Sequence, residues 1–180
     1  MLIKPDQSCL IVIDMQERLV PAMQAPARTI RNAGILMTAA DRLDIPILMT
    51  EQYPKGLGNT VKELATLSGK AVVVEKIHFS CMQDAGFAKA FRSLGRKQVV
   101  ITGMESHICV LQTAVQLMDE GFDIFVVTDA TSSRTLESEK ACLDRLGACG
   151  AGIVTTEMVV FEWLGQAGTP AFKELLPLIK

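Results

Sequence analysis

The sequence has little of what marks several specialised classes of protein. Aromatic residues make up 5% of its 180 residues, and the formal net charge at pH 7 is -2. Nucleic-acid-binding domains carry clustered basic residues, often with stacking aromatics, so we expect no nucleic-acid partner. The longest apolar runs are about as long as a strand. Because a membrane span needs roughly 20 apolar residues, we also expect no membrane partner.

Cysteine and histidine are also used sparingly. The chain has five cysteines and two histidines, and no Cys-x-x-Cys pair occurs. An odd number of cysteines without that pairing argues against a disulfide framework and against a thiolate zinc site. The first residues lack a charged segment followed by an apolar one, so we expect no signal peptide and a cytoplasmic location.

Short apolar, β-branched runs alternate with segments of helical periodicity along the whole chain. Strands are predicted at 8–14, 45–50, 71–76, 98–102, 124–129 and 152–156, and helices at 27–43, 60–66, 84–94, 106–120, 136–147 and from Thr169-Pro170 to the end. This alternation predicts an α/β fold. We expect a Rossmann-like three-layer α/β/α sandwich with a mostly parallel six-stranded sheet, formed by one domain over residues 1–180.

Three of the predicted strands lead to residues with reactive side chains. Asp14 ends the first strand, Lys76 ends the third, and Cys109 lies in the first turn of the helix behind the fourth. Parallel strands place their carboxyl ends at one edge of the sheet, where α/β proteins bind ligands. The field of the helix N-terminus and a nearby ammonium both favour a thiolate.

This set of residues suits acyl transfer. Asp14 can take the thiol proton and return it to a leaving amine, while the Cys109 thiolate forms a thioester that water hydrolyses. Backbone N–H groups between Glu105 and Cys109 can hold the oxyanion. Spacing alone leaves open that Cys109 is a core residue, that Asp14 caps a loop and that Lys76 is solvated.

Five motifs in order decide between these readings. They are Ile-Val-Ile-Asp-Met-Gln at 11–16, Thr-Glu-Gln-Tyr-Pro-Lys-Gly-Leu-Gly at 50–58, Glu-Lys-Ile-His-Phe-Ser at 75–80, Thr-Gly-Met-Glu-Ser-His-Ile-Cys-Val at 102–110 and Thr-Asp-Ala-Thr-Ser-Ser-Arg at 128–134. With them the chain resembles the isochorismatase-like (cysteine hydrolase) superfamily over essentially its full length. The resemblance is greatest to small isochorismatase-domain proteins.

The resemblance implies a catalytic triad of Asp14, Lys76 and Cys109. It also implies a cis peptide bond between Met104 and Glu105, just before the nucleophile, and a homo-oligomer. The apolar segment 158–164 is a candidate for the subunit contact.

Four further residues are candidates for the substrate pocket: Gln16, Glu51, Tyr53 and Phe79. Relatives that hydrolyse nicotinamide hold a metal with an acid and two histidines near the end of the second strand. This chain has Glu-Gln-Tyr at 51–53, and no histidine pair lies there, so we expect no metal and no cofactor.

Outside the triad, we expect supporting roles. His107 is two residues from Cys109 in the same helix and therefore faces another way. Asp129 and Arg134 are expected to brace loops, and Cys9 and Cys81 to be inert.

Three functions follow from this reading. The first is a hydrolase that uses the triad on a small acyl or amide substrate with a C–N bond. The second is a vinyl-ether hydrolase of the isochorismate type, which needs Asp14 and Lys76 but not Cys109. The third is a non-catalytic oligomeric scaffold. The presence of Cys109 favours the first, which also predicts that iodoacetamide alkylates Cys109 faster than the other cysteines.

Overall fold

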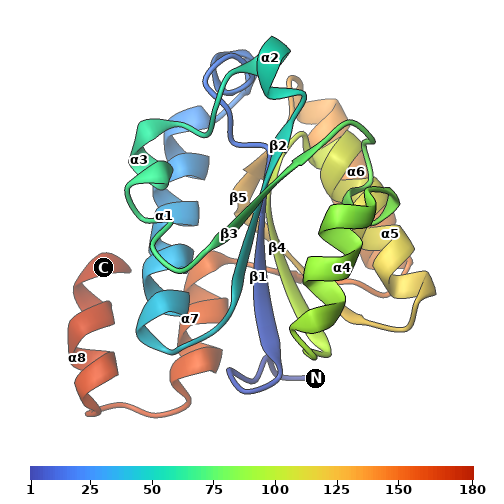
Figure 1. Ribbon diagram of the computed structural model, residues 1–180. Coiled ribbons are helices and arrows are strands. Elements are labelled where there is room, and N and C mark those ends of the chain that lie inside the picture. The colour runs from blue at the N-terminus through green and yellow to red at the C-terminus, as the bar shows by residue number, and fades with distance from the viewer.

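A computed structural model describes all of residues 1–180. Its centre is a six-stranded parallel sheet with the strand order β3-β2-β1-β4-β5-β6 (Figure 1). The strands are β1 (Ser8–Ile13), β2 (Ile47–Gln52), β3 (Val72–Lys76), β4 (Gln98–Met104), β5 (Asp123–Ser132) and β6 (Gly152–Val154). The strand order reverses between β1 and β4, and such switch points are where open α/β sheets bind ligands. The predicted α/β fold class is confirmed.

Helices cover both faces of this sheet. They are α1 (Pro26–Arg42), α2 (Pro54–Leu57), α3 (Lys62–Ala65), α4 (Ala85–Ser93), α5 (Leu111–Asp119), α6 (Leu136–Ala148), α7 (Thr156–Leu164) and α8 (Pro170–Leu175). Helices α1, α3, α7 and α8 pack on one face, and α4, α5 and α6 pack on the other (Figure 1). None of them is both long and apolar enough to cross a membrane.

The sequence of β1 shows why the sheet is buried on both sides. Leu10 and Val12 point into the core beneath α1 and α7, whereas Ile11 and Ile13 point into the core beneath α4 and α5. Because side chains alternate along a strand, a continuous apolar run is what a strand covered on both faces requires. The central strands β1 and β4 are buried along their whole length.

The last third of the chain differs from the prediction. The sixth strand ends at Val154, because the Thr155 side chain accepts a hydrogen bond from Met158 N–H and caps α7. The whole apolar segment 158–164 thus lies in α7, and its Val160 and Trp163 are buried in the chain's own core. This segment therefore serves mainly the fold, although Phe161 keeps 42% of its surface exposed.

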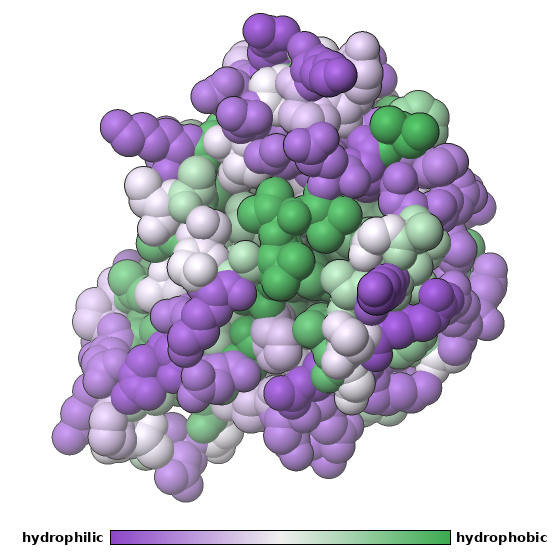
Figure 2. Space-filling view, viewed as in Figure 1, coloured by the Kyte–Doolittle hydropathy of each residue, from purple (hydrophilic) through white to green (hydrophobic).

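The surface viewed in Figure 2 is mostly hydrophilic, with one apolar area in the middle, over β3.

Candidate active site

Asp14 follows directly on β1 in an unusual backbone conformation. Its φ is +51°, in the left-handed region that aspartate tolerates better than most residues. Its N–H donates to Thr50 O at 3.1 Å, and its Oδ1 accepts a hydrogen bond from Thr50 Oγ1 at 2.7 Å. Both residues are buried, so β1 and its neighbour β2 fix the carboxylate together.

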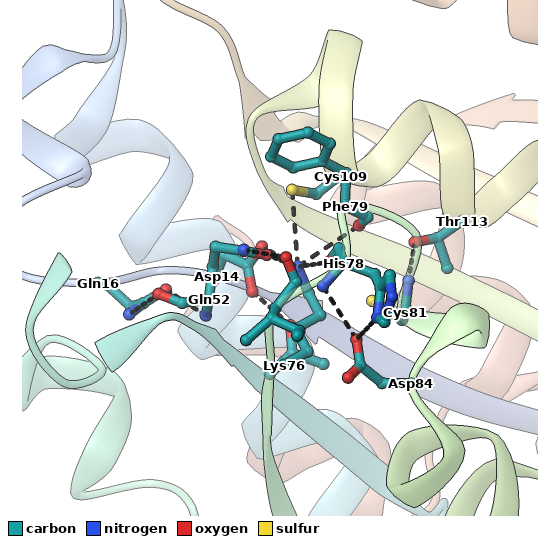
Figure 3. A network of polar contacts seen from close by, with 12 residues as sticks. Asp14, Gln16, Gln52, Lys76, His78, Phe79, Cys81, Asp84, Cys109 and Thr113 are labelled. Atoms are coloured by element: carbon teal, nitrogen blue, oxygen red, sulfur yellow. Dashed lines mark hydrogen bonds and ion pairs between the residues drawn. The ribbon is translucent and has the colours of Figure 1, made fainter. Parts of the chain in front are cut away.

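Lys76 ends β3, and its side chain is fully buried. Its Nζ lies 2.7 Å from Asp14 Oδ2, 2.6 Å from Gln52 Oε1 and 3.6 Å from Cys109 Sγ (Figure 3). An ammonium has three protons to donate, and these three partners can use all of them. The ammonium therefore joins the carboxylate to the thiol, and the three predicted triad residues meet.

Cys109 lies in a π-helical segment, Ser106–Val110, that links β4 to α5. The Cys109 residue is 5% exposed. The chain reaches this segment through Gly103, whose φ is +135°. A Cβ at that position would lie 2.2 Å from Ile13 O, so only glycine lets β4 pass this close to β1. The peptide bond between Met104 and Glu105 is cis.

The charges of the site favour a protonated thiol at rest. Burial raises the pKa of Cys109, the Asp14 carboxylate raises it further, and both outweigh the lowering by Lys76. Burial alone would lower the pKa of Lys76, but the negative charge of Asp14 and its hydrogen bond to the ammonium raise it overall. The sequence predicted that Lys76 would favour the thiolate; its charge does lower the pKa of Cys109, but burial and Asp14 together raise that pKa by more.

Gln52 is a site residue that the sequence reasoning missed. It pairs with Lys76 in the sheet register, and its Nε2 donates to Ile77 O at 2.8 Å, so its Oε1 faces the ammonium. Its position at the end of β2, beside the strand that ends in Lys76, was the available signal.

Gln16 was expected in the substrate pocket, but the structure places it beneath the site. It is fully buried, and its Oε1 accepts from Gln52 N–H at 2.7 Å. Its Nε2 donates to Gln52 O at 3.0 Å and to Gly58 O at 2.7 Å. Gln16 therefore holds the end of β2 in place, because the chain after β1 no longer supplies sheet hydrogen bonds there.

The other three predicted pocket residues have different surroundings. Glu51 Oε1 accepts from Thr60 N–H at 2.6 Å and from Thr60 Oγ1 at 2.7 Å, so this carboxylate pins a loop instead of facing a ligand. Tyr53 and Phe79 are 55% and 54% exposed. Tyr53 lines a surface cavity of about 410 Å³ together with Pro54, Lys55, Glu75, Lys76, Ile77 and Asp84.

The loop after β3 folds over the ammonium. The carbonyl oxygens of His78 and Phe79 lie 3.3 Å and 3.4 Å from Lys76 Nζ. His78 is itself held at the surface, since its Nδ1 lies 3.1 Å from Asp84 Oδ2. Further along, Cys81 N–H donates to Thr113 Oγ1 at 3.0 Å (Figure 3), and burial raises the pKa of the Cys81 thiol to about 12.

Asp129 and Arg134, expected to brace loops, make such contacts, and His107, expected to face away from the thiol, does so. His107 Nδ1 lies 2.9 Å from Ser133 Oγ, so the ring faces the end of β5 and not the thiol. Arg134 Nε lies 2.7 Å from Glu105 Oε2. Asp129 Oδ1 accepts from Thr156 N–H and Oγ1, at 2.8 Å and 2.9 Å, and so fixes the start of α7.

The end of β2 does not fit a metal ion. There Glu51 is bonded to Thr60 and Gln52 to Lys76. No group of three or more His, Cys, Asp or Glu side chains in the structure is arranged to hold a metal.

Known proteins are similar in sequence to nearly the whole chain. The chain is 37% identical over 176 residues to isochorismatase domain-containing protein 1 of Salmo salar, a match that covers 98% of this chain and 62% of the relative. It is 36% identical over 173 residues to isochorismatase domain-containing protein 2 of Danio rerio, covering 96% of this chain and 86% of the relative. The chain therefore spans only about three fifths of the length of the first of these relatives.

Solved structures with the same fold cover nearly the whole chain. A structure described as the MAR1 ribonuclease of Caenorhabditis elegans superposes with a TM-score of 0.93 at 33% identity, covering 99% of this chain and 92% of that one. The YcaC gene product of Escherichia coli, described as an octameric hydrolase of unknown specificity, superposes with a TM-score of 0.93 at 24% identity, covering 99% and 90%.

The isochorismatase domain family matches residues 8–158. With that match and relatives above 30% identity over almost the whole chain, the protein belongs to the isochorismatase family.

Proposed function

We propose that the protein is a cysteine hydrolase that cleaves a C–N bond in a small acyl or amide substrate through a thioester on Cys109. The observation that carries this proposal is the Lys76 ammonium, 2.7 Å from Asp14 Oδ2 and 3.6 Å from Cys109 Sγ in a buried site. A thiol, a base and a cation in contact are the parts that covalent acyl transfer needs.

The first half of the reaction consumes the resting thiol. As the substrate carbonyl approaches, Asp14 takes the thiol proton and the sulfur forms a C–S bond to the carbonyl carbon. Backbone N–H groups between Glu105 and Cys109 stabilise the oxyanion. Asp14 then gives the proton to the amine, the C–N bond breaks, and a thioester remains on Cys109.

The second half restores the enzyme. Water attacks the thioester as Asp14 accepts one of its protons, the C–S bond breaks, and the carboxylic acid leaves. Asp14 returns the proton to the departing sulfur. Lys76 remains an ammonium throughout, and its charge lowers the free energy of forming the thiolate at both stages.

The descriptions of two solved structures with the same fold support covalent cysteine chemistry. YcaC of Pseudomonas aeruginosa, 24% identical with a TM-score of 0.93, is described with covalent acrylamide. A protein of Pseudomonas syringae with a TM-score of 0.81 is described as a cysteine hydrolase. We also propose that the protein forms a homo-oligomer. We further propose a cytoplasmic location, although one relative at 34% identity is named a secreted effector.

A vinyl-ether hydrolase is the second candidate. The Asp14–Lys76 pair and Gln52 form a contact set that is complete without the thiol, and the thiol is protonated at rest. Proton transfer from a carboxyl group to an enol ether would need no nucleophile.

Cys109→Ala separates the candidates. The purified protein is incubated with a panel of small amides, ureido compounds, thioesters and isochorismate, and is weighed intact after acid quenching. The proposal expects an acyl mass on the wild-type chain with an amide or thioester substrate, and no turnover in Cys109→Ala. Isochorismate hydrolysis that survives this substitution would select the vinyl-ether reading. Activity on none of the panel, with no adduct, would favour the non-catalytic scaffold.

A further inference from the structure

The strand that delivers Lys76 is the least covered of the three that build the site. The strands that lead to Asp14 and Cys109 are buried throughout, whereas Val72 and Val73 of β3 are 49% and 47% exposed. Successive side chains on a strand point to opposite faces, so both faces of β3 are open at this point. The apolar area in Figure 2 lies over this strand.

The outer edge of β3 is also free. β3 is the last strand on its side of the sheet, and Tyr53 N–H donates to Lys76 O at 2.9 Å. Lys76 and Val74 therefore turn their backbone groups towards β2. By the alternation of a parallel ladder, Val73 and Glu75 turn their N–H and C=O groups outward. An apolar edge with free backbone groups is a template for another strand.

We propose that β3 pairs with β3 of a second copy of this chain. The two strands run antiparallel around a two-fold axis near Val73, which joins the two sheets into one. A second strand would hydrogen-bond to the outward backbone groups of this edge and would cover its valines on both faces. A two-fold contact supplies the same strand to both copies.

The charges that flank β3 fit this orientation. Lys70 precedes the valines and Glu75 follows them, so antiparallel pairing brings each Glu75 towards the partner's Lys70 end. Parallel pairing would bring like charges together, which is unfavourable across strands. Lys70 lies 3.2 Å from Asp44 Oδ1, but its side chain is 76% exposed and can still reach across the interface.

The pairing has a consequence for the site. An edge strand opens more easily than a strand hydrogen-bonded on both sides, and here the edge strand positions the ammonium. A second β3 would hold the backbone that carries Lys76. The β3 contact does not depend on the proposed reaction, so it is expected equally if the protein is a non-catalytic scaffold.

Proline at residue 73 tests the pairing. The Val73 N–H points outward, and proline is tolerated on edge strands at such positions, so Val73→Pro should fold while blocking strand addition. Val73→Thr keeps the N–H and is the matched control. Sedimentation equilibrium of the full chain should show a dimer or larger assembly for wild type and Val73→Thr, and an association at least about tenfold weaker for Val73→Pro. A wild-type chain that stays monomeric up to about 100 μM, or a folded Val73→Pro variant that associates like wild type, overturns the proposal.

A charge exchange decides the orientation and covers the case that Val73→Pro fails to fold by circular dichroism. Lys70→Glu and Glu75→Lys should each weaken association several-fold, and the double variant should recover it. A double variant as weak as the single variants, or single variants without effect, contradicts the antiparallel contact. Cys109→Ala should associate like wild type, which keeps this result separate from the test of the chemistry.

Discussion

Replacing Lys76 by methionine should make the Cys109 thiol much less reactive. The substitution keeps the length of the side chain and removes its charge, so it takes away the one cation that stabilises the thiolate. The Nζ lies 3.6 Å from Cys109 Sγ. Two unit charges at that distance interact by about 4–5 kcal/mol at an effective dielectric of about 20.

Losing that energy raises the pKa of the thiol and lowers the thiolate population about a thousandfold. Because burial and Asp14 already raise this pKa, the thiolate is a minor species at pH 8, and its population falls in proportion. Alkylation of Cys109 at pH 8 should therefore slow about a thousandfold in Lys76→Met.

The assay is timed labelling with iodoacetamide, followed by mass spectrometry of each cysteine peptide. Cys149 is exposed and reports the reagent's intrinsic rate in the same sample. Cys9, Cys81 and Cys142 are buried, so fast labelling of these three would reveal unfolding instead of a local effect. Lys55→Met, at an exposed lysine beside the site, is the matched control and should label like wild type.

A double variant separates the loss of the ammonium from the effect of leaving Asp14 unpaired. Lys76→Met leaves Asp14 as a buried carboxylate without its partner, which typically costs about 3–5 kcal/mol of stability. Asp14→Asn combined with Lys76→Met removes both charges and should label faster than Lys76→Met alone, because the anion that raises the pKa of the thiol is gone. Labelling of Cys109 in folded Lys76→Met within about threefold of wild type would refute this account of the electrostatics.

Other expectations concern the framework. Gly103→Ala should lower the free energy of unfolding by more than about 4 kcal/mol or prevent folding, because its Cβ would meet Ile13 O. Gly86→Ala is the control and should leave the free energy of unfolding unchanged, and thermal melting of both variants makes the comparison. Gln16→Leu should cost about 2–4 kcal/mol in urea unfolding, since it leaves buried backbone partners unpaired, and an unchanged midpoint would contradict this. Burial raises the pKa of Cys9 from 9.0 to about 12, so the unfolded chain ionises first and this thiol alone should lower stability by about 1.4 kcal/mol per pH unit between these values. The buried Cys81 and Cys142 thiols add slopes of the same kind, so Cys9→Ala should make the total slope shallower by the Cys9 contribution in denaturation curves recorded from pH 8 to 11.

The sequence was most informative where one physical cause dominates. β1 and β4 are continuous apolar runs because both faces of the sheet are covered, so their places followed from those runs. Their parallel direction followed from the alternation of strands with helices. Once the strands are parallel, Asp14, Lys76 and Cys109 must share an edge, and the contacts of Lys76 show that they do. The meeting of the three side chains was therefore predictable from where each strand ends.

The sequence was less informative where several side chains compete for the same partners. Gln16 was expected to face a ligand, but the end of β2 needs hydrogen bonds that β1 no longer provides, and Gln16 supplies them from a fully buried position. Glu51 is likewise engaged by Thr60. Which polar residue faces the ligand and which supports the loop depends on distances of a few ångströms, and spacing along the chain does not carry that information.

A nucleophile that rests as a thiol changes how selectivity is achieved at this site. A permanent thiolate would attack any small electrophile that reached it, whereas in the proposed mechanism Cys109 first loses its proton to Asp14. That transfer becomes favourable as a bound carbonyl begins to accept the sulfur's electrons and the backbone N–H groups take up the new negative charge. Lys76 sets how much this step costs, and Lys76 stands on the one strand of the site with an open edge. If a second copy covers that edge as proposed, it would therefore act on the reactivity of Cys109 through the position of a single ammonium.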